Sequence, residues 1–179
     1  MSAGDDDYTP ASRLRLLQAE FLQPGRGQHH ERAAKADTPS VPIRIAIYDH
    51  IRAAVDEVTE HTRAVAPDAG PRPERADMVY DWMREHTAHL DAERQRAREA
   101  LIYRHGLEHA LAMGESKVIR RQACPGCGTW GLFWRRDREA AVCVNRFCAD
   151  DDGVSRTWTL AQIADDHIAR KESSARRAT

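Results

Sequence analysis

The stretch that decides the fold of the C-terminal third is Cys124-Pro125-Gly126-Cys127-Gly128, followed further on by Cys143-Val144-Asn145-Arg146-Phe147-Cys148. Each pair of cysteines lies on one tight turn, so both thiols of a pair can reach the same ion. The spacer has the length of two short strands and a turn, which would bring the second pair back to the first. We therefore predict that one metal ion is bound by Cys124, Cys127, Cys143 and Cys148.

Zinc is the ion that this ligand set favours, because Zn²⁺ takes four tetrahedral ligands and binds thiolates at about 2.3 Å. Four protein ligands leave no position for water, so a structural site is predicted and not a catalytic one. A dithiol redox site at Cys124 and Cys127 is one alternative, but it would need a helix where strand-like residues follow. An iron–sulfur cluster is another, since it also uses four cysteines.

The Cys-Pro-x-Cys-Gly segment, the hairpin and the second cysteine turn resemble the zinc-ribbon class. This resemblance implies a small β-hairpin fold organised around one zinc ion. Four residues separate the cysteines of the second pair, where the usual ribbon has two, so an enlarged second knuckle is expected. Residues 117–170, with Cys-Pro-Gly-Cys-Gly-Thr-Trp-Gly-Leu-Phe-Trp and Thr-Trp-Thr-Leu, also look like small proteins of actinobacteria and their phages. That likeness implies no particular activity.

Helical periodicity dominates the chain before the cysteines. Apolar residues recur at helical spacing after Thr9, from about Ser40, and again from about Glu74 to Met113, where Gly106 should interrupt or bend the helix. Two of these apolar stripes are predicted to pack together, within one chain or between two copies, because neither helix could bury its apolar face alone. They are Ile47, Ile51, Val55 and Val58 on one helix, and Val79, Trp82, Met83 and Leu90 on the other.

The pattern changes after Gly114, so we predict an α+β protein. Residues 117–122 are compatible with a strand, and three short strands are expected within 129–135, 140–144 and 155–158. Thr159-Leu160-Ala161-Gln162 has the form of a capping box that opens a closing helix. The predicted organisation is a tail at 1–8, a helical region at 9–114 with linkers near 23–40 and 65–73, the zinc ribbon and closing helix at 115–172, and a tail at 173–179.

Composition limits the classes of function. The 179 residues are 41% hydrophobic and 6% aromatic with a net charge of -1, which favours small packed units and excludes a polycation. No apolar run approaches the roughly 20 residues of a membrane span, and the acidic N-terminus lacks the pattern of a signal peptide. We therefore expect a cytoplasmic protein without a membrane partner, in which cysteines are metal ligands and not disulfides.

Aromatic and histidine residues offer further candidates. Trp130, Trp134 and Trp158 could stack on bases, but at alternating strand positions they are expected to form the small core of the ribbon. His105 and His109 have the spacing of helical metal ligands, yet no adjacent glutamate completes a hydrolytic motif, so a surface or packing role is expected.

These patterns favour a nonenzymatic binding or regulatory protein and leave catalytic activity open. Nucleic acid, either DNA or RNA, is the first partner class, because guanidinium groups match phosphate oxygens and Arg135, Arg136 and Arg138 lie near the tip of the predicted hairpin. Asp137 and Glu139 lie among them, so a solvated face of mixed charge is the competing interpretation. The second hypothesis is a protein-interaction adaptor, in which the helices bind a partner or form a homo-oligomer and the zinc site is scaffold.

Overall fold

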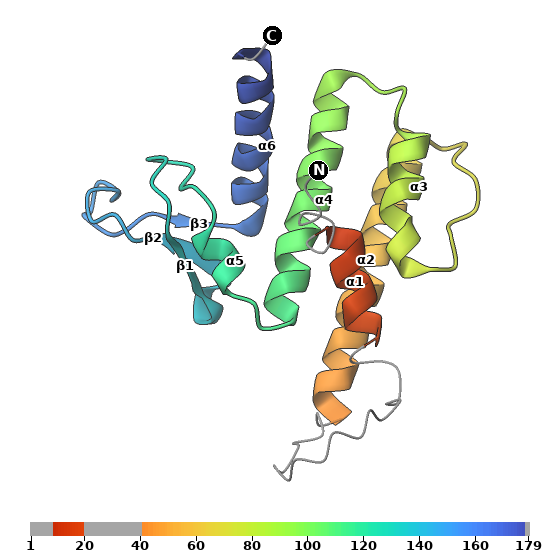
Figure 1. Ribbon diagram of the computed structural model, residues 1–179, viewed down its shortest axis with the longest axis horizontal. Helices are drawn as coiled ribbons and strands as arrows, with labels where there is room; N and C mark the ends of the chain where they lie inside the picture. The colour runs from red at the N-terminus through yellow and green to blue at the C-terminus, as the bar shows by residue number, and fades with distance from the viewer. Residues whose placement is uncertain (1–8, 20–40, 178–179) are drawn as a thin grey trace, which may run out of the picture. The chain divides into compact units, whose positions relative to one another are not determined.

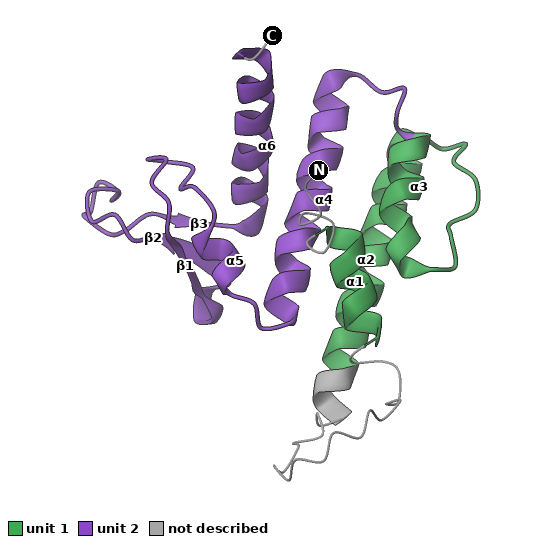
Figure 2. Ribbon diagram, in the orientation of Figure 1, with its two compact units in different colours: residues 1–86 green, residues 87–179 purple. Residues whose placement is uncertain are grey.

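The computed structural model describes residues 9–19 and 41–177. The chain divides into two compact units, residues 1–86 and 87–179 (Figure 2). The sequence pattern instead predicts a boundary between residues 114 and 115. The division lies earlier because the helix α4, Ala92–Ala112, packs along the closing helix α6, Leu160–Arg177. The predicted tail at 1–8 and linker near 23–40 lie outside the described residues.

The first unit is built from helices (Figure 1). Its elements are α1 at Pro10–Leu17, α2 at Val41–Val65, the 3-10 turn η3 at Ala76–Met78 and α3 at Val79–His86. Thr9 caps α1, since its hydroxyl oxygen accepts the N–H of Ser12 at 3.2 Å, and a proline occupies the first turn. The prediction of a helix beginning near Ser40 is confirmed.

Apolar stripes from these helices make the core of the first unit. α2 packs against α3, and α1 packs against η3. The two predicted stripes are largely buried within one chain, although Val55 is half-buried and Leu90 belongs to the second unit. The large buried apolar side chains are Leu14, Leu17, Ile47, Ile51, Val58, Val79, Trp82 and Met83.

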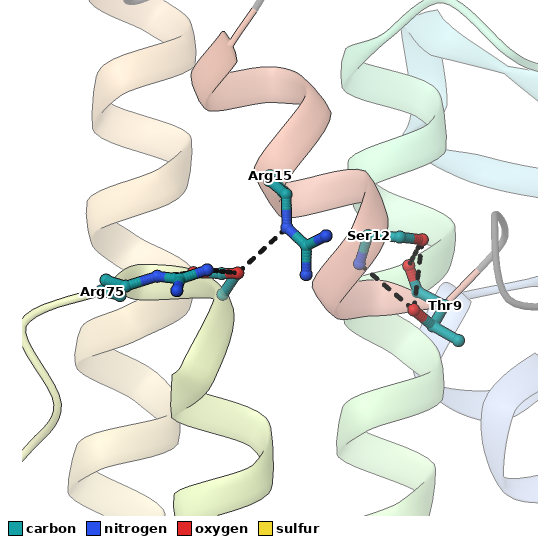
Figure 3. A network of polar contacts seen from close by, with 5 residues as sticks. Thr9, Ser12, Arg15 and Arg75 are labelled. Carbon is teal, nitrogen blue, oxygen red and sulfur yellow. Dashed lines mark hydrogen bonds and ion pairs between the residues drawn. The ribbon is translucent and has the colours of Figure 1, made fainter.

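A buried carboxylate joins α1 to η3 (Figure 3). Asp77, whose side chain is only 4% exposed, accepts the Nε–H of Arg15 at 3.1 Å and hydrogen bonds from Nη2 and Nε of Arg75 at 2.6 and 3.1 Å. Burial alone would raise the pKa of Asp77, but the hydrogen bonds and charges of the two arginines outweigh it and hold that pKa below its ordinary value.

The prediction of one helix from Glu74 to Met113 is wrong at residues 87–91. There the chain forms a turn between α3 and α4. Asp91 caps α4 by accepting the N–H of Arg94 at 2.9 Å. Gly106, where the bend was expected, lies inside α4 without interrupting it.

Arg98 explains the turn at residues 87–91. Although Arg98 lies in a highly charged stretch of sequence, its side chain is buried and its Nη1 donates to the hydroxyl of Thr87 at 3.0 Å. The guanidinium therefore reaches back from α4 and holds the turn that precedes the helix.

The second unit combines a small sheet with helices. β1 at Leu132–Arg135, β2 at Ala140–Cys143 and β3 at Thr157–Trp158 form an antiparallel sheet in the order β1-β2-β3. Leu132 lies opposite Cys143, and Ala141 lies opposite Trp158. The predicted α+β class, with three short strands and a closing helix, is confirmed.

Residues 117–122 were expected to be strand-like, and that prediction is wrong. Lys117–Arg120 is the short helix α5, which contacts β1 and places Ile119 in the apolar core of the unit. Burial of this one side chain overrides the β-propensity of its neighbours.

The capping box that opens α6 is confirmed. The hydroxyl oxygen of Thr159 accepts the N–H of Gln162 at 3.2 Å, and Oε1 of Gln162 accepts the N–H of Thr159 at 2.9 Å. α6 continues to Arg177, past the position where a tail was predicted. None of the helices in the two described ranges has the length and apolar character needed to cross a membrane.

Candidate metal centre

The four cysteine sulfurs converge on one point in the second unit, all within 4.8 Å of one another. The sulfurs of Cys124 and Cys148 are 3.7 Å apart, and so are those of Cys127 and Cys143. Four sulfurs at about 2.3 Å from a central zinc ion would be about 3.8 Å from each other in a tetrahedron. The spacing therefore fits one shared tetrahedral ion, and it is far longer than the ~2.05 Å of a disulfide bond.

Backbone hydrogen bonds shape the first knuckle, residues 124–129. The N–H of Gly128 donates to the carbonyl of Cys124 at 2.8 Å, and the N–H of Cys124 donates to the carbonyl of Thr129 at 2.9 Å. Gly128 has φ +73°, a left-handed conformation that favours glycine. A Cβ on Gly126 would lie 2.8 Å from the indole of Trp158, so this turn needs a residue without a side chain.

The enlarged second knuckle, residues 143–148, is held by the chain that leads into β3. The N–H of Cys143 donates to the carbonyl of Arg156 at 3.1 Å, and the N–H of Arg156 donates to the carbonyl of Cys148 at 3.0 Å. Asn145 lies between the knuckles: its Oδ1 accepts the N–H of Phe147 at 3.1 Å, and its Nδ2 is 3.8 Å from the sulfur of Cys127.

The thiols have different electrostatic surroundings. Burial raises the pKa of Cys148 to about 12 and also raises the pKa of Cys143. Hydrogen bonds from the hydroxyl and the N–H of Thr129 lower the pKa of Cys127 to about 6. Buried thiolates require a compensating positive charge, and a divalent cation would supply it while displacing the thiol protons.

The closing helix reaches the first knuckle through Arg170. Its Nη2 donates to the carbonyl of Cys124 at 3.2 Å, and its Nε donates to Asp166 at 2.6 Å. Sequence reasoning missed both Arg170 and Asn145. The place of Asn145 between two cysteines is a local signal, whereas nothing near residue 170 points to the knuckle.

An apolar cluster surrounds the site. It contains Leu107, Ile119, Leu132, Ala141 and Ile163 together with Cys124, Cys143 and Cys148. Trp134 and Trp158 pack against this cluster as predicted. The prediction is wrong for Trp130, which is 67% exposed because it precedes β1 and pairs only with Ala123 through an isolated bridge.

The three candidate arginines all lie at the hairpin turn. Arg135 ends β1, and Arg136–Arg138 form the exposed turn η4. Arg135 binds Asp137 through two hydrogen bonds, of 2.9 Å from Nε and 2.8 Å from Nη2. Arg136 and Arg138 have no hydrogen bond to an acidic group within the described residues.

His105 and His109 are buried in α4 with ring centroids 5.9 Å apart. Neither belongs to a metal-binding cluster in the part of the chain that the structure describes. Of the two expected roles, surface or packing, their burial favours packing.

Comparisons of this chain with protein-family models, curated proteins and solved structures found no match. The geometry alone therefore defines the class of site. It is a centre of four cysteines, supplied by two turns and spaced to bind one metal ion.

Proposed function

We propose that the chain is a zinc-ribbon protein and that the four cysteines hold one structural zinc ion. The tetrahedral sulfur spacing and the all-thiol donor set support this choice of ion. The ion would join the two knuckles and neutralise the buried thiolates. With no ligand position left for water, it would serve folding and not catalysis. The proposed setting is the cytoplasm, where cysteines remain reduced.

We propose that this ribbon binds nucleic acid. The observation that carries the proposal is the pairing of exposed aromatic rings with arginines. The guanidinium of Arg146 lies 4.7 Å from the ring centroid of Phe147, which is 81% exposed, and that of Arg120 lies 5.9 Å from the centroid of exposed Phe133. Proteins that bind single strands combine such stacking surfaces with cations that track the backbone.

The hairpin turn adds a place for phosphates. Arg136 and Arg138 are exposed there without an acidic hydrogen-bond partner in the described chain, while Arg135 is occupied by Asp137. Guanidinium groups at the tip of a hairpin can reach a groove or a single strand. The predicted group of three arginines is thereby narrowed to Arg136 and Arg138 as the main phosphate contacts.

The test is binding to mixed DNA and RNA pools, measured by fluorescence anisotropy at two salt concentrations. Arg136→Ala/Arg138→Ala should weaken binding at least about tenfold at low salt and reduce the salt slope by about 2, because two phosphate contacts are lost. Zinc content should not change. Arg52→Ala/Arg63→Ala, two exposed arginines on α2, is the control of equal charge. Failure of the wild type to bind any pool at low salt would contradict the proposal.

The adaptor remains the second candidate because α2 carries exposed apolar side chains. Ile45 and Tyr48 are 55% and 54% exposed. An adaptor or homo-oligomer would use this surface, with shallow salt dependence. Ile45→Ser/Tyr48→Ser should then abolish self-association in sedimentation experiments or the co-purification of a protein partner. The arginine variant at the hairpin should leave both unchanged.

A further inference from the structure

A cavity of about 450 Å³ lies in the second unit between α6 and the outside of the first knuckle. Its volume is within the ~300–1,000 Å³ range of small-ligand sites. Residues of α6 three and four positions apart form one wall, and those that carry polar groups are Asp166, His167, Arg170, Lys171 and Ser174. Arg121, Gly128 and Trp130 contribute to the other side. The cavity adjoins the candidate metal centre, because Arg170, one of its lining residues, donates to the carbonyl of Cys124.

The charge of the cavity is positive. Asp166 accepts the Nε–H of Arg170 at 2.6 Å, so these two charges compensate each other. Arg121 and Lys171 are exposed and have no acidic partner within the described residues. Two cations are therefore left to attract an anion from opposite walls.

The cavity also contains an exposed aromatic ring, that of Trp130, whose backbone is held in place by a β-bridge. Trp130 is 67% exposed, and its backbone is fixed by the bridge to Ala123. On the other wall, His167 stacks on Tyr103 with ring centroids 3.9 Å apart and an interplanar angle of 11°. The hydroxyl of Tyr103 donates to Gln122, another lining residue, at 2.9 Å. The walls are thus held by contacts that require no ligand.

We propose that this cavity holds one nucleotide of a single-stranded nucleic acid, with its base on Trp130 and its phosphate between Arg121 and Lys171. The inference rests on the proposed function and locates a second contact beyond the hairpin turn. A single strand is favoured over a duplex because a paired base does not offer its face to an indole. Base–aromatic stacking is tolerant of sequence, so the cavity would select a strand and not a particular base.

The experiment compares a short oligothymidylate with thymidine monophosphate as probes, using the full-length protein loaded with zinc. Binding of the oligonucleotide should quench tryptophan fluorescence. Trp130→Leu should remove most of that quenching and weaken binding about tenfold, a typical loss for one stacked base. Arg121→Ala/Lys171→Ala should weaken binding and lower the salt slope by about 0.7, because both cations contact one phosphate of a single strand. All three side chains are exposed, so zinc content and thermal stability should stay at the wild-type level.

The variants separate the failure of this inference from the failure of the proposed function. Arg52→Ala/Arg63→Ala again controls for net charge. If the oligonucleotide binds and only the hairpin variant Arg136→Ala/Arg138→Ala weakens it, the cavity is not a nucleotide site, although the function stands. If thymidine monophosphate binds through Trp130 but the oligonucleotide does not bind, the cavity is not a site for a single-stranded nucleic acid. If the wild type binds neither probe, the proposed function itself fails.

Discussion

The two units reach a stable fold by different means. In the first, long helices bury apolar stripes against each other, and a buried carboxylate adds two ion pairs. The sheet in the second has strands of only four, four and two residues, and three of the eight buried residues in the adjoining cluster are cysteines. Small domains with so little apolar surface usually need a metal or disulfides. Loss of the metal should therefore affect one unit and spare the other.

The largest expected effect is that of Cys124→Ser, which should abolish metal binding and unfold the ribbon. Ion binding and folding are one event in such sites, and structural zinc supplies about 10–16 kcal/mol in zinc-finger peptides. Native mass spectrometry should show the loss of one zinc ion, while the helices of the first unit keep their protection from hydrogen exchange.

Cys127→Ser sharpens that test because Cys127 is exposed whereas Cys124 is buried. If the sulfurs act as metal ligands, both variants should lose the ion. If Cys124 matters only for packing, Cys127→Ser should behave like the wild type, and that result would contradict the metal account.

The next effect in size concerns the core of the first unit. Ile51→Asp should cost more than about 3 kcal/mol, because it buries a charge at a well-packed site. Chemical denaturation followed in the first unit should show this loss, and zinc content should be unaffected. Ala53→Asp on the exposed side of α2 is the matched control. Unchanged thermal stability and oligomeric state in Ile51→Asp would show that this face is not a core.

A smaller effect is expected from Asp77→Asn, about 1–3 kcal/mol at neutral pH, since the hydrogen bonds to Arg15 and Arg75 lose their charge. The folded-state pKa of Asp77 is lowered, so its stabilisation is complete above the unfolded pKa of about 3.9 and is lost as pH falls through the folded pKa. The variant should therefore flatten the stability of the first unit between neutral and acidic pH. Equal pH dependence in both proteins, measured by hydrogen exchange in α1 and α2, would rule out this role.

The smallest predicted effect lies at the start of α6. Thr159→Ala should destabilise the second unit by about 1 kcal/mol, because the N–H of Gln162 loses its capping partner. Ser173→Ala, at an exposed position late in the same helix, should change stability by less than about 0.5 kcal/mol. Equal denaturation midpoints for the two variants would show that the cap contributes nothing measurable.

The sequence was sufficient to predict those parts of the fold and of the candidate site that depend on residues close together in the chain. The spacing of the cysteine pairs predicted that four sulfurs meet, and Thr159 with Gln162 predicted the start of α6. The sequence was insufficient where a contact between residues far apart in the chain determines the local structure. The turn at 87–91 depends on the buried Arg98 reaching Thr87, and the first knuckle is bound by Arg170 from 46 positions away. Nothing in the pattern around these arginines distinguishes them from solvated ones.

The most direct test of the account is hydrogen–deuterium exchange on the full-length protein with and without a zinc chelator. Chelation should remove protection throughout residues 124–158, while α2 and α3 should exchange as slowly as before. Protection of the ribbon that survives complete removal of the metal would contradict it. So would a simultaneous loss of protection in both units.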